Sequence, residues 1–216
     1  MTTPTLQTRP KAPSAGRIWH PWSESRGFSL VEVLISIVIL SFGMLGIVAL
    51  QASALQANRE ARLQSVASNL ARDLAEMMRS NKAISVLTGT ANPYLGDFNN
   101  PNGATPLAPA TSAYCLSVGV TACVLPLDIA NAQMTEWLAR VDSELPAARV
   151  VVCSDSSPFD ASGLPQWVCG TGAGANLVIK LGWTRGSTNR TNTGAAAFDR
   201  ADVPSIVIPI TPGNAA

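Results

Sequence analysis

An uninterrupted apolar run is the feature that most restricts how this chain can fold. Residues 33–50 are 18 consecutive uncharged residues, most of them apolar. As an α-helix, a run of this length is about 27 Å long, close to the thickness of a bilayer's hydrocarbon core. A single carboxylate, Glu32, stands immediately before the run. Because a charge inside a membrane costs free energy, we expect Glu32 to have a partner or a function.

The charges before the run predict which side of the membrane each part of the chain occupies. Arg9, Lys11, Arg17 and Arg26 precede the run, against a single acid, Glu24. The positive-inside rule therefore keeps the first residues in the cytoplasm and sends the rest of the chain across the membrane. The formal net charge of the whole chain is only +1, which argues against nucleic acid as a partner.

The helical pattern continues beyond the apolar run without a glycine or a proline. Apolar residues recur mostly at spacings of three and four, with polar residues between them: Leu55, Leu63, Val66, Leu70, Leu74 and Met77 or Met78. This spacing is typical of an amphipathic helix. We therefore predict one helix over about 28–84, with an apolar part (28–54) and an amphipathic part (55–84). The apolar stripe of the second part needs a globular domain to cover it, which we assign to residues 85–216.

The remaining sequence predicts one more helix and several short strands. Residues 85–113 are rich in Asn, Pro, Gly and Thr, and we predict a surface loop there. After Pro126, apolar residues at helical spacing predict a helix that Asp128 caps and Pro146 ends. Four later segments have the composition of strands: 149–153, 166–169, 176–184 and 205–210. Together these elements predict an α+β fold in which a small antiparallel sheet packs on the long helix.

The residues just before the apolar run form a specific motif. The segment RGFSLVE (26–32) contains a basic residue, Gly27, Phe28, a small polar residue, two aliphatic residues and Glu32. It resembles the type III signal of type IV pilins and of the pseudopilins of type II secretion. In that family a prepilin peptidase cuts after the glycine and then methylates the new N-terminal residue. The resemblance implies that residues 1–27 are a cytoplasmic leader, that the cut falls between Gly27 and Phe28, and that Phe28 becomes N-methylated.

The motif also gives Glu32 a physical role. Removal of the leader would leave a cationic amine on Phe28, at the end of an apolar helix. When such helices bundle into a filament, the amine of one subunit can face the Glu32 carboxylate of the next, so that neither charge is buried alone. We therefore predict that Glu32 is a docking charge between subunits. Other interpretations stay open: Ser29 and Glu32 also fit a capping box, an uncut signal anchor could carry the same residues, and conventional signal cleavage could occur near residues 52–54.

Later segments resemble PilV-type minor pilins. They are residues 71–81 (ARDLAEMMRSN), the block at 137–146 and residues 177–183 (LVIKLGW). The chain has no proline between Pro21 and Pro93, whereas major pilins of the family usually have one that kinks the helix. The resemblance implies a low-abundance pilin that helps to initiate or cap a pilus together with other minor pilins. The alternatives are a minor pseudopilin of a type II secretion system and an uncleaved, membrane-tethered adhesin or binding domain.

Catalysis is not expected of this chain. Its only histidine, His20, lies in the predicted leader, so the exported part has no Ser-His or Cys-His pair and no histidine metal site. The sequence contains no P-loop, CxxC pair or GxGxxG motif. We expect a structural protein without a cofactor. The resemblance places it in the bacterial inner membrane with a periplasmic C-terminus, and then in a pilus at the cell surface.

The four cysteines all follow the apolar run, on the side predicted to be exported. An even number in an oxidising compartment predicts two disulfides, and four cysteines allow three pairings. We favour Cys115–Cys123 and Cys153–Cys169, because each pair closes a short segment that turn residues can fold back. Metal binding is the alternative, but the spacing lacks paired ligands of the CxxC kind.

Overall fold

The computed structural model describes residues 27–99, 105–116, 122–187, 191–194, 198–199 and 201–211. The chain divides into two compact units, Met1–Leu50 and Gln51–Ala216. In the first unit the description begins at Gly27, so the rest of the predicted leader lies outside the described residues.

The described part of the first unit is helical and has no buried residue. α1 begins at Leu30 and ends at Ser80, and its residues up to Leu50 belong to this unit. No proline interrupts the segment, and its β-branched Val and Ile residues lower helix propensity only slightly. Within the described residues, α1 is the one helix long and apolar enough to cross a membrane, with a mean hydropathy of 2.8 in its most apolar window.

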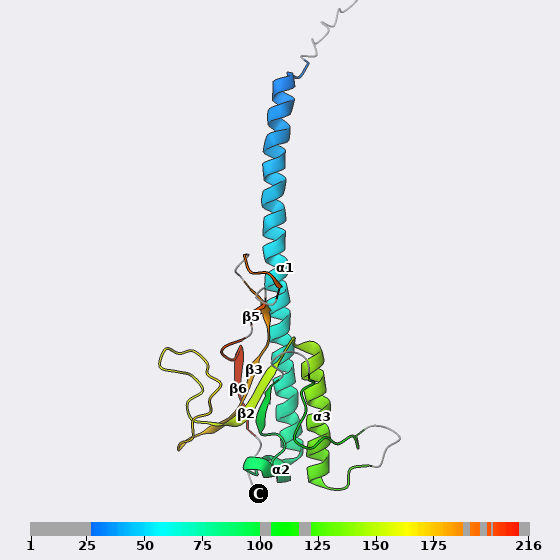
Figure 1. Cartoon of the computed structure of the whole chain (residues 1–216), viewed down its shortest axis with the longest axis vertical. Coiled ribbons are helices and arrows are strands. Elements are labelled where there is room, and N and C mark those ends of the chain that lie inside the picture. The colour runs from blue at the N-terminus through cyan, green and yellow to red at the C-terminus, as the bar shows by residue number, and fades with distance from the viewer. Residues whose placement is uncertain are drawn as a thin grey trace, which may run out of the picture. The chain divides into compact units, whose positions relative to one another are not determined.

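In the second unit, the later part of α1 packs beside α3, which runs from Pro126 to Glu144 (Figure 1). The indole N–H of Trp137 on α3 donates a hydrogen bond of 2.8 Å to the backbone carbonyl of Leu70 on α1. Apolar residues on the facing sides of the two helices are buried: Ala67, Leu70, Ala71, Leu74 and Met78 on α1, and Ala130, Met134, Trp137, Leu138 and Val141 on α3. The predicted amphipathic stripe is therefore largely covered, as its spacing requires.

The helix ends differ in detail from the sequence prediction. The helix predicted to reach residue 84 is interrupted at Asn81, after which α2 (Lys82–Ser85) adds one short turn. The Asn81 side chain instead donates a hydrogen bond of 2.7 Å to the carbonyl of Pro126 at the start of α3. The prediction that Asp128 caps α3 is wrong. The N-cap is Leu125, no side chain caps the helix, and Asp128 lies in the first turn, where a carboxylate still interacts favourably with the helix dipole.

The second unit contains a four-stranded sheet in the order β1-β2-β3-β6, with every neighbouring pair antiparallel. The strands are β1 (Gly96–Asn99), β2 (Arg149–Asp155), β3 (Asn176–Gly182) and β6 (Ile206–Pro209). A 3₁₀ turn, η1 (Gly89–Ala91), precedes β1, and β4 (Arg185–Gly186) pairs with β5 (Phe198–Asp199) in a separate ribbon. A helical layer on an antiparallel sheet confirms the predicted α+β class.

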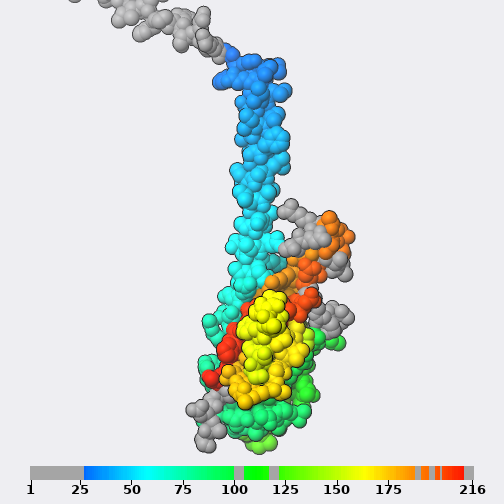
Figure 2. Space-filling view, turned by 90° about the vertical axis from the view of Figure 1, so that its left-hand side faces the viewer, coloured from blue at the N-terminus to red at the C-terminus, as the bar shows by residue number. Residues whose placement is uncertain are grey.

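Both faces of the sheet are covered. One set of side chains belongs to the core shared with α1 and α3: Val150, Val152, Ile179 and Leu181. The alternate positions point the other way and are also buried: Val151, Val178 and Lys180. Their cover is the segment that joins β2 to β3, which forms the yellow surface of this unit in Figure 2.

Two predictions of secondary structure are wrong. Residues 166–169 form no strand, because the carbonyls of Gln166 and Val168 accept hydrogen bonds from the side chain of Lys180 instead of from a neighbouring strand. The predicted surface loop 85–113 contains β1, together with the buried residues Tyr94 and Phe98. Gly, Asp and Asn are rare in strands, so the sequence GDFN of β1 carries almost no strand signal.

Candidate functional site

The N-terminal motif lies in the first unit, at the start of α1. Gly27, Phe28 and Ser29 precede the helix, which begins at Leu30, and all three residues are exposed. A Cβ placed on Gly27 would meet no heavy atom within 4 Å. Proteases bind their substrates in extended conformations, so an exposed, non-helical peptide bond is accessible to one. The Gly27–Phe28 bond meets both conditions.

Glu32 lies in the first turn of α1, four residues after Phe28. Its backbone N–H donates to the carbonyl of Ser29 over 2.9 Å, and its own carbonyl accepts a bond of 2.7 Å from the Ser36 hydroxyl. Phe28, Glu32, Ser36 and Leu40 border a shallow hollow of about 320 Å³ on one side of the helix. The structure therefore brings the predicted cleavage site and the predicted docking charge to one surface.

The carboxylate of Glu32 forms no ion pair with the described residues. Within the described residues no cation lies within 4.0 Å of it. The Glu32 N–H bonds to the Ser29 carbonyl and not to the Ser29 hydroxyl, so the described part of the chain does not form the capping box that the sequence permits. In the uncut chain Phe28 is joined to Gly27, so the free amine predicted to pair with Glu32 would exist only after the predicted cleavage.

Two family models match this region of the chain. Residues 22–48 match the prokaryotic N-terminal methylation motif, and residues 49–92 match a family described as type IV pilin Tt1218. Together the two matches cover residues 22–92, about a third of the chain. The predicted resemblance to type IV pilins is thereby confirmed, whereas the closer resemblance to PilV-type minor pilins stays a prediction. No curated protein and no solved structure matches the chain.

The second unit contains two disulfides. They join Cys115 to Cys123 and Cys153 to Cys169, with Cα–Cα distances of 5.1 and 6.5 Å. These are the pairs that the sequence favours. The sulfur atoms of Cys153 and Cys169 lie within 4.8 Å of a carboxylate oxygen of Asp155. Sulfurs joined in a disulfide offer no thiolate, so this cluster is not a set of metal ligands.

A buried ion pair lies beneath the loop that Cys153 and Cys169 close. The side chain of Lys180 is 0% exposed, and its ammonium lies 2.5 Å from the Asp155 carboxylate. The ammonium also donates to the carbonyls of Gln166 (2.6 Å) and Val168 (2.8 Å). The buried ammonium therefore has one ion pair and two hydrogen bonds within its own chain.

Asp155 completes this cluster from β2. One carboxylate oxygen accepts bonds of 2.8 Å from the backbone N–H groups of Ser157 and Gly170, near the two ends of the loop. Burial by itself would raise the pKa of Asp155, but Lys180 and the two N–H donors outweigh it and lower that pKa below its ordinary value. The carboxylate is therefore charged at neutral pH and holds both ends of the loop.

An aromatic contact holds the same loop on the sheet. Trp167 packs directly on β3 at Gly182, where a Cβ would lie 2.8 Å from the ring. The guanidinium of Arg149 lies 4.5 Å from the centre of that ring and also pairs with Asp97 on β1, at 2.6 Å. The loop is thus fixed by a disulfide, a buried ion pair and a stacked tryptophan.

Sequence reasoning did not identify Lys180 or Asp155. A lysine in an alternating strand is usually a solvent-facing residue, and LVIKLGW places Lys180 on the face opposite Ile179 and Leu181. The only available signal was that Val178, on the same face as Lys180, is apolar, which hints that this face is covered too.

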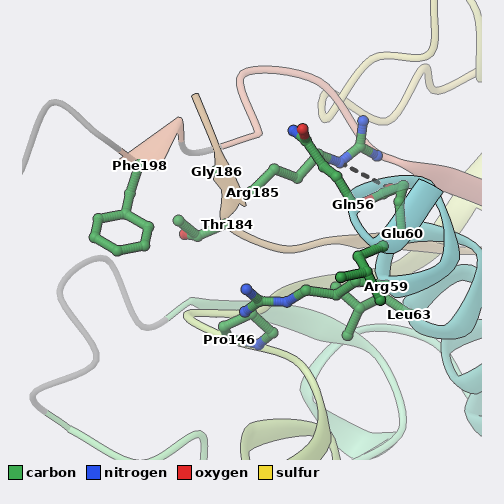
Figure 3. Close-up of a pocket in the computed structure, with 10 residues that line it drawn as sticks. Gln56, Arg59, Glu60, Leu63, Pro146, Thr184, Arg185, Gly186 and Phe198 are labelled. Carbon is green, nitrogen blue, oxygen red and sulfur yellow. Dashed lines mark ion pairs between the residues drawn. The ribbon is translucent and has the colours of Figure 1, made fainter. Parts of the chain in front are cut away.

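A pocket of about 580 Å³, here called the Arg59 pocket, lies beside α1 in the second unit (Figure 3). One wall is the side of α1 that carries Leu55, Arg59 and Leu63, and Pro146 and Phe198 line the pocket from other segments. Arg185 on β4 forms an ion pair of 3.1 Å with Glu60 on α1, drawn as the dashed line in Figure 3.

Proposed function

We propose that this chain is a type IV pilin subunit that enters a filament after a prepilin peptidase removes residues 1–27. The observation that carries the proposal is the start of α1, where an accessible Gly27–Phe28 bond precedes Glu32, an acid that forms no ion pair with the described residues. Cleavage would create the missing partner, because it frees the amine of Phe28. N-methylation leaves that amine basic, so it keeps its positive charge.

The apolar part of α1 supports assembly through this pair of charges. All its side chains up to Leu50 are exposed, so lipid must surround them before assembly and other subunits must cover them afterwards. A carboxylate buried alone in such a bundle would be costly, whereas a charge pair between neighbouring subunits satisfies both groups. The pair would fix the axial register of the helices more than it would add stability.

The proposed partners and location follow from this cycle. The precursor is held in the bacterial inner membrane by α1, with residues after Leu50 in the periplasm, where two disulfides can form. The prepilin peptidase acts on the precursor, and other pilins are its partners in the filament. The role is structural, without a catalytic site or cofactor.

Within this class, we assign the chain a PilV-like minor role in initiating or capping the pilus. The resemblance of residues 71–81, 137–146 and 177–183 to PilV-type pilins supports it, as does an α1 without the proline of major pilins. Quantitative mass spectrometry of sheared pili should find far fewer copies of this chain than of the major pilin. Equal abundance would contradict the minor role alone.

Mass spectrometry of the N-terminus tests the proposed function directly. With the prepilin peptidase present, the mature chain should begin at N-methylated Phe28, and without it the leader should remain. A mature chain that keeps its leader in the presence of the peptidase, or that begins near residue 54, would refute the proposal.

The docking role of Glu32 has a separate test. Glu32→Gln should be processed normally but be depleted from sheared pili, because the Phe28 amine would then be buried without a counter-charge. Glu76→Gln is the matched control, since Glu76 is an exposed acid on the same helix. Wild-type amounts of Glu32→Gln in pili would exclude the docking role.

A further inference from the structure

The domain leaves the first part of the amphipathic stripe uncovered. Leu70 and Leu74 are buried and Leu63 is half-buried, but Leu55 is 70% exposed. Phe198, which lines the same pocket from β5, is 62% exposed. Large apolar side chains gathered around one pocket are typical of a surface that a partner covers.

The Arg59 pocket also carries one positive charge that no carboxylate of the described residues neutralises. Figure 3 shows the Arg59 side chain extending from α1 into the pocket. Glu60 already pairs with Arg185, and no carboxylate of the described ranges lies within 4.0 Å of Arg59. The complementary occupant is therefore an apolar surface that bears a carboxylate.

This pilin presents such a surface at the other end of its own second unit. Three exposed apolar residues precede or begin α3: Val124, Leu125 and Leu127. Asp128 follows them and forms no ion pair with the described residues. The hydrogen bond between Asn81 and Pro126 places this segment at the C-terminal end of α1, which lies about 30 Å along the helix from Arg59.

Subunits whose helices run parallel in a filament contact each other head to tail, so that different surfaces of the same fold meet. In such an interface, the surface at the C-terminal end of α1 in one subunit faces the part of α1 where the second unit of the next subunit begins. In this chain, the surface at the C-terminal end of α1 is apolar and carries the acid Asp128. The Arg59 pocket, nearer the N-terminal end of the second unit, is apolar and carries a base.

We infer that the Arg59 pocket is the docking site for a neighbouring pilin, which inserts an apolar segment bearing one carboxylate against Arg59. The inference rests on the proposed function, because it needs parallel packing of pilin helices. The apolar contacts with Leu55 and Phe198 hold the segment, and Arg59 selects for the acid and against a basic partner.

Photo-cross-linking in cells that make the filament tests this inference. A photoreactive amino acid replaces Leu55 in the otherwise intact chain, and the cross-linked peptide is sequenced. The expected product joins this chain to a pilin at an apolar segment that contains Asp or Glu. Arg59→Glu should reduce this product about tenfold, the effect of roughly 1.4 kcal/mol, whereas Arg59→Lys should retain it.

Arg62→Glu is the matched control, because Arg62 is exposed on the same helix but does not line the pocket. It should leave the product unchanged. A cross-link to lipid, to a protein that is not a pilin, or to a pilin with a yield unaffected by Arg59→Glu would overturn the inference.

Leader removal and pilus content are measured on the same samples. A processed chain that is present in pili but gives no pilin cross-link from Leu55 overturns the docking site and leaves the proposed function standing. If the leader is retained in these cells, the measurement of leader removal refutes the proposed function. The inferred docking site is then refuted as well, because it depends on that function.

Discussion

Replacing Lys180 with methionine should destabilise the second unit severely. Methionine has a similar volume but no donor, so the Asp155 carboxylate would lose its cation and the carbonyls of Gln166 and Val168 would lose their donors. Breaking a fully buried ion pair from one side costs about 3–5 kcal/mol. For a chain of this size, that loss corresponds to a fall in melting temperature on the order of 10 °C.

Equilibrium unfolding of the full-length protein in detergent measures this loss, with both disulfides intact and tryptophan fluorescence as the signal. Lys82→Met is the control, because Lys82 is partly exposed and forms no ion pair with the described residues. Its unfolding free energy should change by no more than about 0.5 kcal/mol. A loss in Lys180→Met as small as the control's would refute the assigned role of the buried pair.

The pH dependence separates the loss of the charge pair from a packing defect. In the wild-type protein the pKa of Asp155 is lowered, so its contribution to stability is present above the unfolded pKa of about 3.9 and is lost as pH falls through the folded value. In Lys180→Met, the Asp155 carboxylate is still buried but has lost the ammonium, so its pKa rises. Lowering the pH then protonates this carboxylate and removes the cost of burying its charge. The difference in stability between the two proteins should therefore shrink from pH 7 towards pH 4. If the difference in stability stays constant with pH, the loss in Lys180→Met comes from packing and not from the charge pair.

Three further predictions concern the second unit. Gly182→Ala places a Cβ 2.8 Å from the Trp167 ring. It should lower the free energy of unfolding by about 1–3 kcal/mol and speed proteolysis of the loop that carries this ring. Gly186→Ala, with open space around it, should do neither. The double variant Cys153→Ser, Cys169→Ser opens a loop of 16 residues and should lower the free energy of unfolding by about 3 kcal/mol. Alkylation of the wild-type protein should find no free thiol. Burial raises the pKa of Tyr94 to about 12, so absorbance titration should show one tyrosine that ionises only near that pH and is missing in Tyr94→Phe.

The parts of the fold that sequence predicts well are those with a long or strict local signal. α1 has an apolar run followed by a stripe at helical spacing, and α3 has a proline in its first turn and apolar residues at the same period. The N-terminal motif depends on consecutive residues alone. The family match at 22–92 therefore covers the region where local sequence is most informative.

The parts that sequence misplaces depend on tertiary contacts. β1 is a strand because β2 pairs with it along Gly96–Asn99, not because its residues favour strands. Residues 166–169 have strand-like composition, yet they form a loop because Lys180 reaches their carbonyls from β3. No local pattern reports that a lysine in an alternating strand faces a covering loop instead of water.

Two charges in this chain lie among apolar residues, and their surroundings differ. Lys180 is surrounded by its own chain, which supplies a carboxylate and two carbonyls within 2.8 Å. Glu32 borders the apolar part of α1, where the described residues supply no cation. A fold that satisfies one buried charge completely has no physical reason to retain a second, unsatisfied charge at the edge of an apolar helix. This contrast supports the proposal that Glu32 pairs with the amine that the proposed cleavage would free at Phe28 on a neighbouring subunit.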